Sequence, residues 1–404
     1  MIDRPHPVRR ALLGSLLATP ALAPPALVPP ALAQTSAQEW RLGGLFPLSG
    51  ANAVLGDEAA RGLEIAIAER NAAGGRPCRL IRADVTEPAQ ALAEARRLIQ
   101  AERAVLLFGS VSAPIGLAAS QAAESLDSTF VELAAAADAL FERGARHLVR
   151  TAPSAADYGL LGAEALTRFL PNHLGHPADA LRITILHEAG ASSESIATHL
   201  EARLRETGLV VAERLPHAAR TPEMPAMVQR LRAAGVNVLI HAAAEGDAVA
   251  LFRAMQDANW RPPAILGAGP AWGLVELSRA IGPALDGCFG LDVPPIETAE
   301  RWATGARPFA EAYQRRWGSA PRSGLSLAAY AGALAVLAQP SLERAALRGG
   351  LATLDQAEGQ WANGWGFRLD DRGQNLRARP VLLQWQAGRP VAVFPAEAAA
   401  ASPV

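Results

Sequence analysis

Short apolar runs alternate along the chain with longer segments whose apolar residues recur at helical spacing. The apolar run 104–108 is typical, because it stops at Gly109 and a helical pattern resumes after Pro114. Such alternation with short connections predicts parallel β-sheets with helices on both faces. Strands are expected at 40–48, 78–84, 104–108, 129–133, 147–150, 182–186, 209–214, 236–240 and 264–266.

The intervening segments predict helices with recognisable starts. Asp57 is expected to cap a helix over 58–71, and Pro88 and Pro114 each suit a first helical turn. Further helices are expected at 157–170, 193–206, 225–234, 247–258, 308–317 and 325–339. The tail changes to short alternating β runs at 366–369, 381–385 and 390–394. The pattern predicts two α/β halves in series.

Length and composition narrow the class of protein. A chain of 404 residues favours two lobes, and 50% hydrophobic with 19% charged residues supplies a substantial core. The net charge of -1, without a basic cluster, predicts no nucleic-acid partner. All 38 basic residues are arginine, which excludes a Schiff-base or Walker-type lysine.

The first stretch has the features of an export signal. Arg9 and Arg10 precede an apolar stretch interrupted by prolines, and Ala31 and Ala33 form a small-x-small cleavage site. We predict a signal peptide over 1–33, cleaved near Ala33 by either the general or the twin-arginine export route. The mature chain is expected in the periplasm without membrane insertion, because a spanning helix needs about 20 uninterrupted apolar residues.

Neither the cysteines nor any sequence motif indicates a catalytic or metal-binding site. Cys78 and Cys288 either pair in an oxidising compartment or remain separate buried thiols. His187-Glu188 lacks the second histidine of a zinc helix, and neither a P-loop nor a G-x-S-x-G elbow occurs. We therefore predict no enzyme, no cofactor and no metal.

The turn that contains Ser110 and Ser112 lies at the carboxyl end of a predicted strand, directly before a helix. In open parallel sheets ligands bind at this edge, and a helix N-terminus favours an anionic group. An exported, two-lobed chain without a catalytic signature is typical of a protein that closes on a small molecule.

Five stretches then match one family in order, namely 46–50 with Gly56, 66–75, 84–99, 108–112 and 150–153. On these residues the chain resembles the leucine/isoleucine/valine-binding family of periplasmic binding proteins, receptors of branched-chain amino acid ABC importers. The resemblance implies the type I periplasmic binding fold, with two Rossmann-like lobes, parallel sheets and a three-crossing hinge. Lobe one would be 38–153 plus 292–365, and lobe two 154–291 plus 366–396.

The resemblance also implies where a ligand binds. In lobe one, hydroxyl and N–H groups of the turns 110–113 and 133–136 would hold a carboxylate. The backbone N–H donors of both turns are expected to be free for a ligand. In the second turn, alanine replaces the serine or threonine whose hydroxyl the family usually provides. In lobe two, amino-acid binders place a carboxylate that pairs with the ligand's ammonium group, and this chain has Gly267–Pro270 at that position. Glu245 and Asp247 either take over the role of that carboxylate or cap the next helix. The candidate ligand residues are Ser110, Ser112, Ala113, Ala134, Ala136, Tyr158, Ser192, Glu245, Gly269 and Trp272.

Tyr158 and Trp272 are equally interpretable as cleft walls or as core. The function expected from the resemblance is a monomeric receptor that captures a small polar or carboxylate-bearing ligand for ABC permease subunits. Because the ammonium partner is missing, we expect a ligand other than leucine, such as an amide, a small carboxylate or an aromatic acid. A ligand sensor of the same fold and an exported hydrolase are the alternatives.

Overall fold

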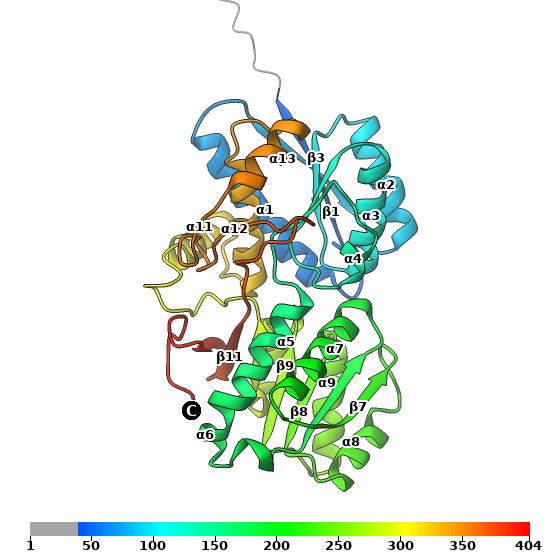
Figure 1. The fold of residues 1–404 in the computed structure, drawn as a ribbon, viewed down its shortest axis with the longest axis vertical. Coiled ribbons are helices and arrows are strands. Elements are labelled where there is room, and N and C mark those ends of the chain that lie inside the picture. Colours follow the sequence, from blue (N-terminus) through cyan, green and yellow to red (C-terminus); the bar gives the residue numbers. More distant parts are fainter. Residues whose placement is uncertain (1–38) are drawn as a thin grey trace, which may run out of the picture. The chain divides into compact units, whose positions relative to one another are not determined.

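Five parallel strands form the first of two sheets in a computed structural model that describes residues 39–404 (Figure 1). The sheet order is β2-β1-β3-β4-β5. Its central strands are buried on both faces, as parallel sheets covered by helices must be. The strands are β1 Trp40–Phe46, β2 Cys78–Asp84, β3 Leu106–Gly109, β4 Thr129–Glu132 and β5 Leu148–Arg150. The predicted signal peptide and its cleavage site lie outside the described residues.

Helices from two separate parts of the chain, 53–142 and 306–353, cover this sheet. In Figure 1, α12 and α13 lie in the same lobe as α1 although some 250 residues of chain separate them. A Cβ at Gly62 of α1 would come 2.0 Å from the Ser326 carbonyl oxygen of α12, so these helices need glycine to approach. The helices are α1 Ala53–Ala72, α2 Pro88–Gln100, α3 Ala113–Ser125, α4 Ala139–Glu142, α11 Ala306–Trp317, α12 Gly324–Leu337 and α13 Arg344–Thr353.

The second sheet has seven strands in the order β12-β11-β10-β9-β8-β6-β7. Strands β6 to β10 run parallel, and β11 and β12 are antiparallel additions at one edge. The strands are β6 Ile183–Glu188, β7 Val211–His217, β8 Val238–Ala242, β9 Ala264–Ala268, β10 Phe289–Asp292, β11 Val381–Gln386 and β12 Arg389–Phe394. Its helices are α5 Ala155–Glu164, α6 Leu170–Leu174, α7 Ala191–Glu206, α8 Met224–Ala233, α9 Glu245–Asp257 and α10 Val275–Ile281.

The chain passes between the lobes three times: after β5, after β10 and before β11, because α11, α12 and α13 pack in the core of the first lobe between strands β10 and β11 of the second sheet. Two of these passages are hydrogen-bonded to each other, because Gln374 Nε2 donates to the Ala152 carbonyl at 3.0 Å and Asn375 Nδ2 to the Thr151 carbonyl at 3.3 Å. The predicted α/β fold with two lobes is confirmed. Below, each lobe is named by its sheet; Trp365 and Phe367 pack in the core of the first lobe, and the boundaries proposed from the sequence stay predictions.

Several local predictions are wrong. Asp57 is not a cap, because α1 begins at Ala53 and the Asp57 carboxylate instead pairs with Arg61 and Arg322 within the first lobe. The run 366–369 forms no strand: its pairing is limited to isolated bridges with 356 and 375, and a turn closed by Asp370 follows directly. Helices α4, α10 and α13 were not expected.

The cysteines are separate buried thiols, which settles the alternative left open by the sequence. Cys78 belongs to the core of the first lobe and Cys288 to a core cluster of the second. Burial raises the pKa of the Cys288 thiol to about 12, so this group stays protonated and unreactive at neutral pH.

Candidate functional site

A cavity of about 510 Å³ opens where the carboxyl ends of strands from both lobes meet. The first lobe contributes the start of α1 and the turn 111–114 before and into α3. The second lobe contributes 188–193, 243–247 and 268–271, which follow β6, β8 and β9. Five of the candidate residues line it: Ser112, Ala113, Ser192, Glu245 and Gly269. This edge of a parallel sheet is where ligands bind in open α/β folds.

Four α-helices begin at the cavity. Asn52, Ser112, Gly190 and Ala244 are the N-cap residues of α1, α3, α7 and α9. The first N–H groups of a helix have no partner within the helix, and its N-terminus carries a partial positive charge. The backbone therefore makes the cavity attractive to polar and electron-rich groups.

Three acidic side chains reach the cavity from the second lobe, and two are already engaged. Glu188 Oε2 accepts the Ala244 N–H at 3.2 Å, and the buried Asp247 accepts the Arg220 N–H at 2.7 Å. Glu245 makes no hydrogen bond or ion pair with the described residues, and burial together with the charge of Glu276 raises the pKa of its carboxyl. Asp247 thus holds a loop in place, and Glu245 is the acid available to a ligand.

Ser192 offers a second available group on the same side. Its hydroxyl oxygen is enclosed and has no hydrogen-bond partner among the described residues. The hydroxyl lies in the first turn of α7, beside the N–H groups of that turn. A buried hydroxyl without a partner is costly, so a polar ligand atom would satisfy it.

Glu132, which the sequence analysis missed, lies at the corresponding edge of the first lobe. It is the last residue of β4 and is 0% exposed. Its Oε1 accepts the N–H groups of Ser110, Ala134 and Ala135 at 2.9, 3.0 and 2.9 Å. The Ser110 hydroxyl lies within hydrogen-bond distance of two acceptors, Glu132 Oε2 at 2.9 Å and the Ser112 carbonyl oxygen at 2.8 Å. Burial raises the pKa of the Glu132 carboxyl, and the hydrogen bonds act in the opposite direction.

This network corrects one expectation. The N–H groups of Ser110 and Ala134 are not free for a ligand anion, because a carboxyl group of the chain already takes them. The sequence signal is a glutamate that ends an otherwise apolar strand, Thr129–Glu132. Two of its N–H partners, Ala134 and Ala135, are close in sequence, but Ser110 lies 22 residues earlier, directly after the neighbouring strand β3, and no local pattern reveals that contact.

The other candidates lie outside the lining of this cavity. Ala134 and Ala136 are buried in core clusters of the first and second lobes, and Tyr158 is 1% exposed in the second. Trp272 is fully buried, with its ring 5.6 Å from that of His241. A Cβ at Gly267 would come 1.8 Å from the Trp272 ring, so this glycine makes the space that the indole fills. Tyr158 and Trp272 are core residues.

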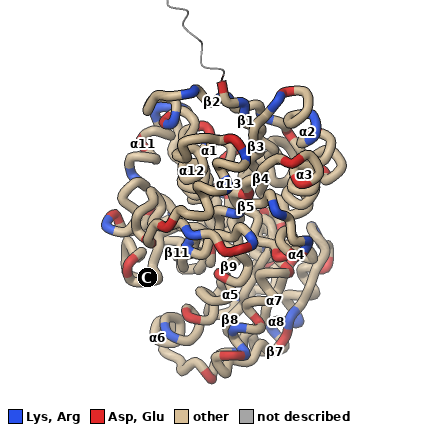
Figure 2. The backbone as a smooth tube through the Cα atoms, turned by 45° about the horizontal axis from the view of Figure 1, so that its top comes forward, with Lys and Arg blue, Asp and Glu red and all other residues tan. Residues whose placement is uncertain are grey.

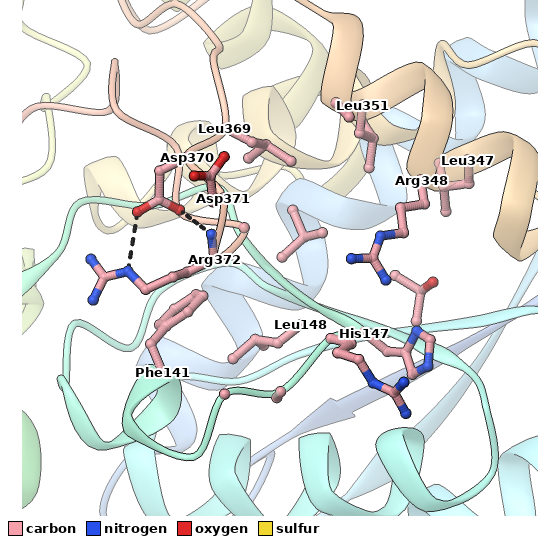
Figure 3. Close-up of a pocket in the computed structure, with 17 residues that line it drawn as sticks. Phe141, His147, Leu148, Leu347, Arg348, Leu351, Leu369, Asp370, Asp371 and Arg372 are labelled. Carbon is pink, nitrogen blue, oxygen red and sulfur yellow. Dashed lines mark hydrogen bonds and ion pairs between the residues drawn. The ribbon is translucent and has the colours of Figure 1, made fainter.

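A second cavity, of about 390 Å³, lies at the outer edge of the first sheet (Figure 3). Phe141, Leu148 and Leu351 give it an apolar surface, and the turn Asp370–Arg372 closes one side. Asp370 accepts hydrogen bonds from the main chain and side chain of Arg372. Only residues of the first lobe and of the passages beside it line this cavity, so a ligand bound there would not contact both lobes.

Charge does not mark either cavity as a nucleic-acid surface. Basic and acidic positions are interspersed along the backbone of both lobes (Figure 2). Within 39–404, no group of three or more His, Cys, Asp or Glu side chains is arranged to hold a metal ion. In the same range, no helix has both the length and the apolar character needed to cross a membrane.

Two α/β lobes, linked by three passages and sharing a cavity at their strand ends, define a bilobal binding-protein architecture. Residues 39–384 match the family model described as periplasmic binding protein. The chain is 34% identical over 375 residues to the Leu/Ile/Val-binding protein homolog 7 of Brucella abortus (strain 2308), covering 91% of this chain and 94% of the relative. The chain therefore belongs to the periplasmic binding protein family, and the resemblance to leucine/isoleucine/valine-binding proteins is confirmed.

Solved structures show the same fold at lower identity. The branched-chain amino acid transporter substrate-binding protein of Streptococcus pneumoniae, in complex with isoleucine, superposes with a TM-score of 0.75 at 16% identity, covering 89% of this chain and 100% of that one. A solute-binding protein of an ABC transporter from Rhodopseudomonas palustris, in complex with 3,4-dihydroxybenzoic acid, gives 0.71 at 17% identity, covering 89% and 98%. The family is one of extracytoplasmic binding proteins.

Proposed function

We propose that this protein is an extracytoplasmic receptor of an ABC importer, which captures a small polar ligand in the cavity between its lobes and delivers it to permease subunits. The observation that carries the proposal is the cavity itself, because it is lined by strand ends and helix N-termini of both lobes. A ligand that contacts both lobes favours their closed arrangement, which is the basis of recognition in a bilobal receptor.

The ligand is anchored mainly on the second lobe. Ser192 offers an unsatisfied hydroxyl and Glu245 an unpaired carboxyl, and the first turns of α7 and α9 add N–H groups. The first lobe contributes Ser112, Asn52 and the apolar Leu55. This set suits a small molecule with an amide, hydroxyl or ammonium group facing the second lobe and an apolar part facing α1.

Relatives support a receptor without fixing the ligand. The named relative is a Leu/Ile/Val-binding protein homolog, and the two structural neighbours hold isoleucine and 3,4-dihydroxybenzoic acid. Leucine itself is a poor candidate here, because Gly267–Pro270 offers no carboxylate and Glu245 alone is left for the ammonium. We expect the receptor to act as a monomer.

The test is a thermal-shift screen of the mature chain against amino acids, amides, aliphatic acids and aromatic acids, followed by X-ray scattering. A ligand at 1,000 times its Kd stabilises the native state by about 4 kcal/mol, which gives an unmistakable shift. The proposal predicts that the ligand found in this way also compacts the protein in solution. Stabilisation without any compaction would argue against capture between the lobes.

Transport is the second part of the test. Deletion of the gene should abolish uptake of the ligand found in the screen, and the wild-type chain should restore it. If uptake is unchanged but the liganded protein binds a regulatory partner, a sensor of the same fold replaces the receptor.

A further inference from the structure

We infer that the Glu132 side chain fills a carboxylate-binding site of the first lobe, formed by Ser110, Ala134 and Ala135 and called the cradle below. The ligand therefore presents no carboxylate to this lobe. The occupancy stands on the hydrogen-bond geometry alone. The consequence for the ligand rests on the proposed function.

The cradle is made by two adjacent strand ends and one helix. Its donors are the N–H groups of Ser110, Ala134 and Ala135 and the Ser110 hydroxyl, all within 3.0 Å of the Glu132 carboxyl oxygens. Three N–H groups that converge on one oxygen are a site built for a carboxylate or a similar oxyanion.

The first turn of α3 closes the cradle from above. A Cβ at Gly116 would come 2.5 Å from Glu132 Oε2 and 2.8 Å from the Ser110 hydroxyl oxygen. The glycine therefore leaves the space that the carboxyl group fills. The partial positive charge at the N-terminus of α3 adds to the attraction for an anion.

Turn 110–113 is shared between the cradle and the cavity. Ser110 faces Glu132, and Val111, Ser112 and Ala113 line the cavity. A ligand carboxylate that entered from the cavity would find the donors already used. Two carboxyl groups at one site also disfavour each other's ionised form. The first lobe is thus left with neutral polar and apolar contacts, and its ligand partner is an amide, a hydroxyl or a hydrocarbon group.

The cradle can be tested without knowing the natural ligand. Glu132→Ala removes the equivalent of one acetate, so sodium acetate should bind the emptied cradle. We expect acetate to raise the melting temperature of Glu132→Ala by about 4 °C or more, saturably, and to leave wild type unchanged. Acetamide and sodium chloride at the same concentration are the matched controls and should have no such effect.

Glu132→Gln is the second variant. Its side chain still fills the cradle, so acetate should not stabilise it. If Glu132→Ala does not fold in chloride, it is refolded from urea, and folded protein should then be recovered in acetate alone. The inference is overturned if acetate stabilises wild type as much as Glu132→Ala, or if Glu132→Ala gains nothing from acetate or fails to refold in it. Failure of the proposed function would look different: the cradle would respond to acetate, and no compound of the ligand screen would bind wild type.

Discussion

The strand ends of the two lobes are built alike and are used differently. In the first lobe, the turns after β3 and β4 give their N–H groups to Glu132. In the second lobe, the turns after β6 and β8 leave the Ser192 hydroxyl and the Glu245 carboxyl without partners among the described residues. Each lobe has a glutamate at a strand end, but Glu132 accepts three N–H groups whereas Glu188 accepts that of Ala244. A shared fold therefore fixes where a ligand binds, and single side chains decide which lobe holds its polar group.

The largest expected effect comes from emptying the first lobe's cradle. Glu132→Ala leaves the buried N–H groups of Ser110, Ala134 and Ala135 without their acceptor, so we expect a loss of about 3–5 kcal/mol in the free energy of unfolding. Urea denaturation measures it. Ser192→Ala is the matched change in the second lobe and should cost less than about 1 kcal/mol, because its hydroxyl has no partner to lose. Equal losses of unfolding free energy in the two variants would contradict the difference between the lobes.

The next effect concerns two glycines in the first turns of helices that begin at the cavity. Gly116→Ala in α3 pushes against Glu132 and Ser110, so we expect a loss of about 1–3 kcal/mol. Gly246→Ala in α9 meets nothing within 4 Å, and should be neutral or stabilise by about 0.5–1 kcal/mol. Thermal or urea unfolding of both variants provides the comparison. A stable Gly116→Ala protein would show that the cradle is not tightly packed.

Ligand affinity should fall in variants of the second lobe whose stability stays unchanged. Ser192→Ala and Glu245→Gln each remove a free polar group from the cavity, and we expect about a tenfold loss of affinity for the compound found in the screen. Their unfolding should stay near that of wild type. Calorimetric titration measures the affinity. Unchanged affinity in both variants would show that the polar contacts of the ligand are not made at the N-termini of α7 and α9.

The smallest effect is on pH dependence. A carboxyl whose pKa is higher in the folded than in the unfolded state holds extra protons when folded, so stability falls as pH rises from the unfolded pKa toward the folded one. The pKa values of Glu132 and Glu245 are both raised, chiefly by burial. Glu132→Gln should flatten the decline above about pH 4.3, by up to about 1.4 kcal/mol per pH unit. Glu245→Gln should flatten it less, because Glu245 is partly exposed. A decline that is unchanged in Glu132→Gln would contradict the raised pKa.

Local pattern predicted the elements well wherever apolar runs were bounded by turn residues. The strand predicted at 78–84 is β2 as observed, and Pro88 begins α2. The start of α1 was misplaced because Asp57 has the chemistry of a cap, but its carboxylate pairs with Arg322, 265 residues away. Long-range ion pairs of this kind leave no local signal.

The sequence predicted the location of the candidate site but not all of the residues that form it. Ser112 and Gly269 line the cavity because strand ends converge at one edge of a parallel sheet, which topology alone dictates. Trp272 was uncertain because its burial depends on the space left by Gly267. Glu132 was missed, because its contacts with Ser110 and the space left by Gly116 exist only when β3, β4 and α3 come together.

The most direct test of the contrast between the lobes is a thermal-shift comparison of wild type with matched acid and amide pairs, namely leucine and leucinamide, benzoate and benzamide, and propionate and propionamide. Because Glu132 occupies the cradle of the first lobe, we predict that the amide stabilises the protein more than the acid in every pair that binds. Stronger stabilisation by a carboxylic acid than by its own amide would contradict it.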